Sequence, residues 1–140
     1  MASGWTNKGK FQDLSQRFRA TTIPTTYNLH LINSTPTADT NTMADVTNAS
    51  NYTEENLAKN ATDFDVITED DGADTAFVQV RDVVFTASGG TITTTFAVLA
   101  DDNATESLRE IYCYWDLGGA QNIPNGDTLT LKDCQQTITE

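Results

Sequence analysis

Short stretches of this chain alternate apolar with polar residues, and residues that favour turns separate them. The clearest stretch covers residues 25–33. Its apolar residues Tyr27, Leu29 and Leu31 fall on one side with a period of two, the pattern of a strand with one buried face. Because such stretches recur at short intervals without a regular strand–helix alternation, the sequence predicts a mainly β fold, either an antiparallel β-sandwich or a flattened barrel.

The same alternation predicts further strands, and the segments between them are rich in Gly, Asp, Asn and Pro. These strands cover residues 62–68, 75–86, 91–100, 110–117 and 127–134, and Ile138 is the outer limit of a candidate continuation of the last one. The acidic, Gly-containing segment 69–74 predicts the turn of a hairpin. Residues 34–60 are dominated by small polar residues and predict a long excursion with one short helical turn.

A helix with one apolar stripe is predicted for residues 7–19. Phe11, Leu14 and Phe18 occupy positions i, i+3 and i+7 there, and Thr6 precedes the segment as a candidate N-cap, with Asn7 as the alternative. The sequence further suggests that the face opposite the stripe is basic. The predicted fold is therefore a β-rich domain preceded by a short N-terminal amphipathic helix.

Charge divides the chain unevenly. Residues 1–20 carry four basic residues and one acidic residue (+3), whereas residues 21–140 carry four basic and nineteen acidic residues (−15). The total of −12 argues against nucleic acid as a partner, because binding phosphates requires a Lys- and Arg-rich surface. We therefore divide the chain into a basic amphipathic helical arm, residues 1–24, and a single β-rich domain, residues 25–140.

The basic helical arm is the candidate site for binding a partner, because positive charge beside an acidic body suits an acidic neighbour, including a second copy of the chain. The alternative is that its cations only solvate a short helix. The candidate partner-binding residues are Lys8, Lys10, Phe11, Leu14, Arg17, Phe18 and Arg19. No apolar run is long enough to span a bilayer, so no membrane partner is expected.

Catalytic and metal-binding patterns are weak in this sequence. The lone histidine, His30, lies in an alternating stretch without a recognisable nucleophile or ligand partner, and we expect it to face solvent. Acidic residues cluster in turns, but their order does not fit a calcium loop, so calcium is only an alternative to solvated carboxylates. A hydrolase that relies on unpaired carboxylates such as Asp101 and Asp102 ranks below a function in binding other molecules. The sequence predicts neither an enzyme nor a bound cofactor or metal.

Two further groups of residues are expected to be structural. Cys113 and Cys134 lack the spacing of a zinc site and are predicted to be buried as small apolar residues, with a disulfide between them as an alternative. Tyr112, Tyr114 and Trp115 could line an interface, but core packing is favoured for large aromatic residues on a strand.

Seven short segments are distinctive in their order along the chain: Trp5–Lys10, Pro36–Thr42, Ala61–Val66, Thr86–Gly90, Ala97–Asp102, Tyr114–Leu117 and Asp127–Leu131. In this order they resemble a family of small structural proteins of tailed bacteriophage virions, found in phages of aquatic bacteria. Together they span most of the chain. Residues 48–60 depart from the family pattern, which is richer in Gly at that place.

The resemblance implies a virion protein that is made in the host cytoplasm. A capsid decoration (cement) protein on the outside of the assembled major capsid lattice is favoured, with the major capsid protein as partner and self-association as a dimer or trimer. Either the basic helical arm or residues 34–60 would form the contact. The alternative is a tail or adaptor component that binds a host receptor or glycan.

Overall fold

The computed structural model describes residues 1–139, and this part of the chain is mainly β, with 46% strand and 14% helix. Its sheets are antiparallel and one short α-helix lies near the N-terminus, so the predicted fold class is confirmed as β-sandwich-like. The elements are β1 (Ser3–Trp5), α1 (Asn7–Arg19), β2 (Thr26–Ile32), the 3-10 helix η1 (Met43–Asp45), β3 (Glu55–Ala58), β4 (Val66–Asp70), β5 (Thr75–Val80), β6 (Val83–Thr86), β7 (Ile92–Ala100), the 3-10 helix η2 (Glu106–Leu108), β8 (Ile111–Ile123), β9 (Thr128–Leu131) and β10 (Cys134–Thr139).

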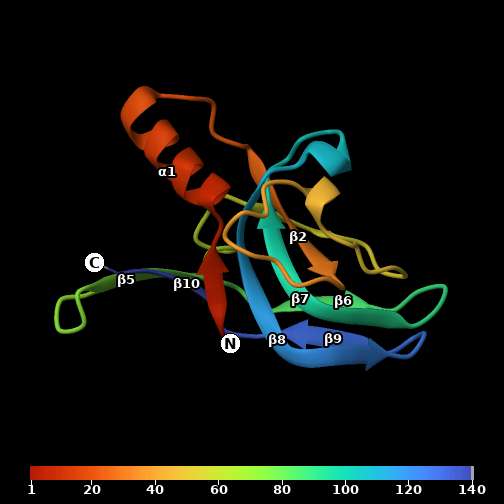
Figure 1. Ribbon diagram of the computed structural model, residues 1–140. Helices are drawn as coiled ribbons and strands as arrows, with labels where there is room; N and C mark the ends of the chain where they lie inside the picture. The colour runs from red at the N-terminus through yellow and green to blue at the C-terminus, as the bar shows by residue number, and fades with distance from the viewer. Residues whose placement is uncertain (140) are drawn as a thin grey trace.

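The largest sheet has five strands in the order β1-β8-β7-β2-β3. Figure 1 shows three of them, β8, β7 and β2, side by side. At its centre, Leu99 of β7 lies opposite Leu29 of β2 and Cys113 of β8. Apolar and aromatic residues on neighbouring strands stabilise a sheet by packing side by side on its buried face. This sheet is the frame on which the other elements are placed.

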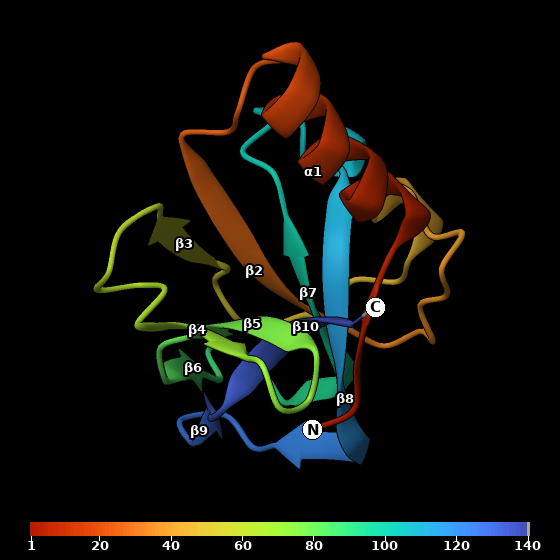
Figure 2. The same cartoon turned by 90° about the vertical axis from the view of Figure 1, so that its left-hand side faces the viewer.

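The remaining strands form a three-stranded sheet, β10-β5-β4, and a two-stranded sheet, β6-β9. Figure 2 shows these two sheets lying together across one end of the large sheet, with α1 nearer its other end. The main core lies between the layers. Its buried residues include Leu29, Leu31, Leu57, Val80, Val83, Phe85, Ile92, Ala97, Leu99, Cys113, Trp115, Leu131 and Cys134.

The opposite face of the large sheet is also covered, by the chain between β2 and β3. A smaller buried cluster there consists of Ile32, Met43, Val98, Ala100 and Ile111. The predicted short helical turn of the 34–60 excursion is present as η1, which supplies Met43. The excursion also contains an edge strand, β3, which the sequence did not predict.

Two of the predicted strands are each divided between two sheets. The stretch 75–86 is broken at residues 81–82, so that β5 joins the three-stranded sheet and β6 the two-stranded one. The stretch 127–134 is likewise broken, and its end forms β10. Val80 and Val83 lie on either side of the first break and are both buried in the main core. In one continuous strand these two residues would point to opposite faces, so the chain must turn a corner between them. The prediction of continuous strands was wrong at both places.

The predicted strand 62–68 begins late, at β4, because residues 60–63 form a turn. The side-chain oxygen of Asn60 accepts hydrogen bonds from the backbone N–H groups of Thr62 and Asp63, both at 2.9 Å. Such a turn competes with a strand ladder for the same backbone groups. The hairpin β4–β5 and its acidic turn are otherwise present as predicted.

The strand β8 continues to Ile123, although the sequence predicted that Gly118 would end it. Gly118 and Gly119 adopt φ angles of 77° and 121°, which are accessible to glycine without strain. Thr94 of β7 pairs with Gln121 of β8, whereas Phe96 pairs with Asp116. The single residue Thr95 therefore lies opposite residues 117–120, and the register of the two strands shifts here. The two glycines therefore form a bulge inside the strand rather than a turn at its end.

Two tryptophan side chains connect β10 to the large sheet. The indole N–H of Trp115 donates to the backbone oxygen of Gln135 at 2.7 Å, and that of Trp5 donates to the backbone oxygen of Thr137 at 3.1 Å. Trp115 is fully buried and Trp5 is half-buried. This linkage brings β10 close to β1 and α1.

Candidate protein-binding surface

The helix α1 begins and ends where the sequence predicted. Thr6 has an extended backbone, and its hydroxyl accepts a hydrogen bond from the backbone N–H of Gly9 at 2.9 Å, which is the geometry of an N-cap. At the other end Ala20 is left-handed, with φ of 50°. Arg17 and Arg19 lie in the last turn, where positive charge interacts favourably with the helix dipole.

The face of α1 that contacts the sheet is small and polar. Gly9 is buried so closely against β8 that a Cβ atom there would lie 2.1 Å from the backbone oxygen of Tyr112. The side-chain amide of Gln16 donates to the Tyr112 hydroxyl at 3.1 Å, and Gln12 hydrogen-bonds to Glu110. The expectation that the face opposite the apolar stripe is basic was therefore wrong, since that face carries Gly9 and Gln16 and contacts β8.

The apolar stripe of α1 points away from the protein. Phe11, Leu14 and Phe18 are 58%, 56% and 75% exposed, and we call these three residues the apolar helix face. An amphipathic helix on a globular domain ordinarily buries its apolar stripe. Here the stripe is left in water, so it is available to a partner.

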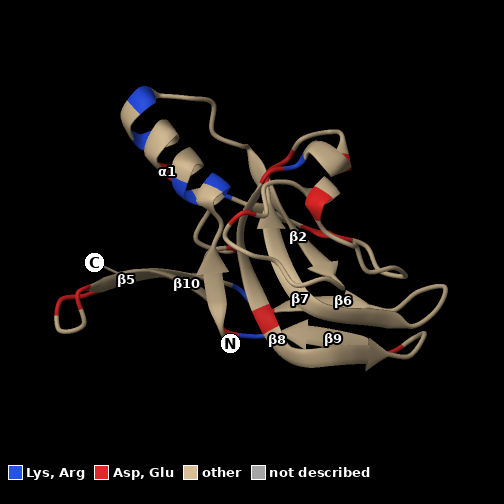
Figure 3. Cartoon of the chain, viewed as in Figure 1, with Lys and Arg blue, Asp and Glu red and all other residues tan. Residues whose placement is uncertain are grey.

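Basic residues surround the apolar helix face on both sides. By helical spacing, Lys10 and Arg17 lie on one side and Lys8 and Arg19 on the other. Lys8 forms an ion pair with Glu110 at 3.2 Å, and Arg17 forms one with Asp13, one turn earlier, at 3.0 Å. All seven predicted partner-binding residues thus lie on one helix, whose Lys and Arg positions are blue in Figure 3. The ion pair with Glu110 turns Lys8 toward the body of the protein.

A groove runs beside this helix, between α1 and β10. Its volume is about 550 Å³, and its walls include Leu14 of α1, Gly4 and Trp5 of β1, and Ile138 of β10. Ile138 is 52% exposed, so apolar surface continues from the helix onto β10. The sequence pattern included Ile138 as the end of an alternating stretch but gave no indication that it would lie beside the helix.

Many carboxylates elsewhere hold turns and loop ends in place. Asp63 accepts hydrogen bonds from Arg81 at 2.7 Å and from the backbone N–H of Ala58 at 2.8 Å, and the Arg81 guanidinium lowers the pKa of Asp63. Asp70 accepts a hydrogen bond from the backbone N–H of Gly72. Within residues 1–139 no group of three or more His, Cys, Asp and Glu side chains is placed to hold a metal ion.

His30 is buried, with 1% of its surface exposed, so the expectation that it faces solvent was wrong. The reason is that β2 is an interior strand of the large sheet and is covered on both faces. The Nε2 atom of His30 lies 3.0 Å from Nη1 of Arg109, which also forms an ion pair with Glu54 at 3.3 Å. Burial and the positive charge of Arg109 lower the pKa of His30.

The cysteines and the aromatic residues of β8 are structural, as predicted. Cys113 and Cys134 are both buried with free thiols, and burial raises the pKa of each thiol. Trp115 and Tyr112 are buried in the main core, and Tyr114 packs against the smaller cluster. The alternative of a disulfide is not realised.

No family model, curated protein or solved structure matches this chain. Among the described residues, none of the helices combines the length and the apolar character that crossing a bilayer requires. The apolar helix face and its flanking cations form an exposed surface, and this surface is the candidate site for a partner.

Proposed function

We propose that this chain is a structural protein of a bacteriophage virion that acts by binding other subunits rather than by catalysis. Its site of action is the outside of the assembled major capsid lattice, where it serves as a decoration (cement) protein after synthesis in the host cytoplasm. The resemblance of seven ordered sequence segments supports the virion assignment. The exposed apolar helix face supports a function in protein binding.

The observation that carries the proposal is the outward orientation of Phe11, Leu14 and Phe18, each more than half exposed. Removing a large apolar side chain from water is worth about 1.5–3 kcal/mol when burial is complete. Because these side chains remain exposed in the folded chain, the free energy of burying them does not stabilise the fold. It contributes to binding when a partner covers the helix. The surrounding cations favour an acidic or carbonyl-rich partner surface over a basic one.

Three apolar side chains on one helix provide a small interface. A lattice compensates for weak single contacts, because neighbouring copies bind at high effective concentration when they are linked as a dimer or trimer. Self-association of the chain belongs to the proposal for this reason. It accounts for stable attachment without a large contact area for each copy.

The location is tested by measuring the composition of purified particles. Quantitative mass spectrometry of whole virions, isolated heads and isolated tails should find the chain on heads, in a number of copies comparable to that of the lattice positions. A few copies found on tails alone would instead support a tail or adaptor component and would contradict decoration.

The contact is tested with undecorated heads and purified protein. The double variant Phe11→Ser and Phe18→Ser should lose most of its binding in a co-sedimentation assay. Ile67→Ser is the matched control, because Ile67 is 77% exposed but lies on β4, in the three-stranded sheet and outside α1. Equal binding by the double variant and the wild type would rule out the apolar helix face as the contact.

A further inference from the structure

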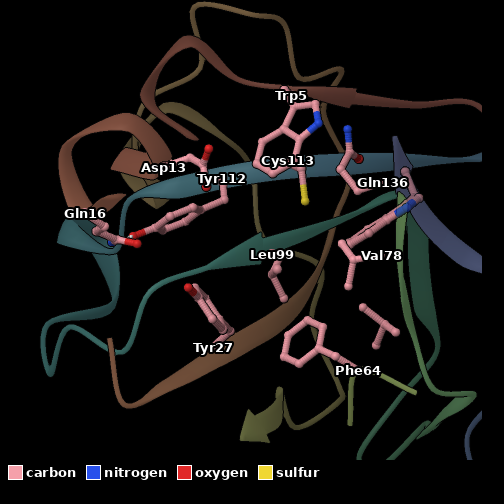
Figure 4. A pocket seen from close by; sticks show the side chains of 12 residues that line it. Trp5, Asp13, Gln16, Tyr27, Phe64, Val78, Leu99, Tyr112, Cys113 and Gln136 are labelled. Carbon is pink, nitrogen blue, oxygen red and sulfur yellow. Dashed lines mark hydrogen bonds between the residues drawn. The ribbon is translucent and has the colours of Figure 1, made fainter. Parts of the chain in front are cut away.

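A cavity of about 140 Å³ lies between α1, the large sheet and the β10-β5-β4 sheet. Trp5, Cys113 and Gln136 stand at one end of it and Tyr27 and Phe64 at the other (Figure 4). The rings of Tyr27 and Phe64 meet edge to face, with centroids 5.9 Å apart. The walls of the cavity are largely aromatic and aliphatic. The cavity is not part of the proposed capsid contact.

One polar atom in this cavity has no partner. The side-chain oxygen of Gln136 is buried and accepts no hydrogen bond, and it is the one buried side-chain polar atom of residues 1–139 in that condition. Gln136 as a whole is 3% exposed. A buried carbonyl oxygen without a hydrogen-bond donor is costly and uncommon in folded proteins. We therefore expect a bound molecule to supply a hydrogen-bond donor to the Gln136 oxygen.

Water is a poor match for this oxygen. A buried water molecule is held by two to four polar partners. The carboxylate and amide groups of Asp13 and Gln16 and the hydroxyls of Tyr27 and Tyr112 also belong to the lining, and they lie away from Gln136 (Figure 4). The residues nearest the Gln136 end, Trp5 and Cys113, offer a ring face and a buried thiol.

The geometry points to a binding site for a small apolar ring that carries one hydrogen-bond donor, the chemistry of a phenol or an indole. A cavity of about 150 Å³ accepts one benzene-sized ring. The ring would pack against Tyr27, Phe64 and Leu99, and its donor would reach the Gln136 oxygen. This inference does not depend on the capsid role.

Access to the site is through the groove beside α1. Trp5, Asp13 and Gln136 line both the groove and the cavity, so the two spaces adjoin. A ring could therefore arrive as a free molecule, or as a tyrosine side chain of a segment lying in the groove. Both sources present the same ring and the same donor.

The test is a titration of the full chain with phenol. Binding is monitored by isothermal titration calorimetry and by the fluorescence of Trp5 and Trp115. Benzene is the matched ligand without a donor. We expect phenol to bind about tenfold more tightly than benzene, as one hydrogen bond to a buried acceptor predicts. N-acetyl-tyrosinamide presents the phenol ring on a peptide backbone. Tighter binding of N-acetyl-tyrosinamide than of phenol would assign the site to a protein segment, and weaker binding would assign it to a free molecule.

Two variants locate the site. Gln136→Met keeps the length of the side chain but removes the oxygen, and it should abolish the preference for phenol while benzene still binds. Leu99→Phe should fill the cavity and abolish binding of both ligands. Gln135→Met is the matched control, because the side chain of Gln135 contacts Gln79 outside the cavity.

The outcomes are distinct. A preference for phenol that disappears in Gln136→Met supports the site, and retained benzene binding in that variant shows that its cavity is intact. Absence of saturable binding of phenol, benzene and N-acetyl-tyrosinamide at millimolar concentration would overturn it. So would phenol binding that neither Gln136→Met nor Leu99→Phe changes.

Discussion

Protonation of His30 is unfavourable in the folded chain. Its ring is buried and lies 3.0 Å from the Arg109 guanidinium, and both effects lower its pKa. The carboxylates of Glu54 and Glu106 oppose the shift but do not cancel it. The folded chain therefore favours the neutral imidazole.

This geometry predicts that acid weakens the fold in a defined range. As the pH falls below 6.5, the ordinary pKa of His30, the unfolded chain binds a proton that the folded chain resists, so the free energy of unfolding decreases. The slope for one such group is at most about 1.4 kcal/mol per pH unit. Urea denaturation measured between pH 7.5 and pH 5 should show the decrease.

The variant His30→Gln separates this effect from that of the carboxylates. Glutamine does not titrate, so the slope between pH 6.5 and pH 5 should largely disappear. The carboxylates with lowered pKa, such as Asp63, lose their contribution only at lower pH. An unchanged slope in His30→Gln would show that another group is responsible.

Gly9 gives a second prediction at this scale. Replacing glycine by alanine inside an exposed helix stabilises it by about 1 kcal/mol. At Gly9 the added Cβ would lie 2.1 Å from the Tyr112 backbone oxygen, so Gly9→Ala should instead destabilise the protein by about 1–3 kcal/mol. Chemical denaturation measures the sign, with Lys10→Ala as the exposed control on the same helix. A stabilised Gly9→Ala protein would mean that α1 does not rest on β8 as described.

At the scale of elements, the sequence predicts those features of a helix or strand that are set by residues close to one another in the chain. The bounds of α1 follow from Thr6 and the apolar spacing, and they agree with the structure. Which face of α1 meets the sheet depends on Tyr112, about a hundred residues away, and the helix pattern alone contains no information about it. The sequence therefore identified the stripe and named it among the candidate partner-binding residues, but its orientation away from the sheet is set by contacts with β8 that the helix pattern does not contain.

The same limit explains the strands that were predicted as continuous. The alternation in residues 75–86 indicates an extended chain correctly, but the corner after Val80 exists because β5 and β6 have different partner strands. The burial of His30 likewise requires the second layer that covers β2. Gln136 was not singled out because its missing partner is a property of the assembled core.

Exposure of the apolar helix face leads to a prediction about stability. Replacing Phe11, Leu14 and Phe18 by Ser should change the free energy of unfolding by no more than about 0.5 kcal/mol for each residue, since exposed side chains contribute little to folding. Denaturation in urea measures this. Val98→Ser, in the buried smaller cluster, is the contrasting variant and should be strongly destabilising. A large loss from the helix variants would show that the stripe is covered in the free protein.

At the scale of the whole molecule, the net charge of −12 opposes folding through self-repulsion. Salt screens this repulsion, since the Debye length falls from about 30 Å at 0.01 M to about 8 Å at 0.15 M. We expect the Tm to rise by a few degrees between these two concentrations. Thermal unfolding followed by circular dichroism measures it, and a lower Tm at 0.15 M would show that attractive ion pairs outweigh the repulsion.

The two indole hydrogen bonds to β10 affect how the protein behaves at high local concentration. Backbone oxygens at the open side of an outer strand ordinarily invite another chain to pair there, which is a route to aggregation. On β10 the oxygens of Gln135 and Thr137 are already occupied by Trp115 and Trp5. Copies at high local concentration can thus meet through side chains without joining their sheets through β10.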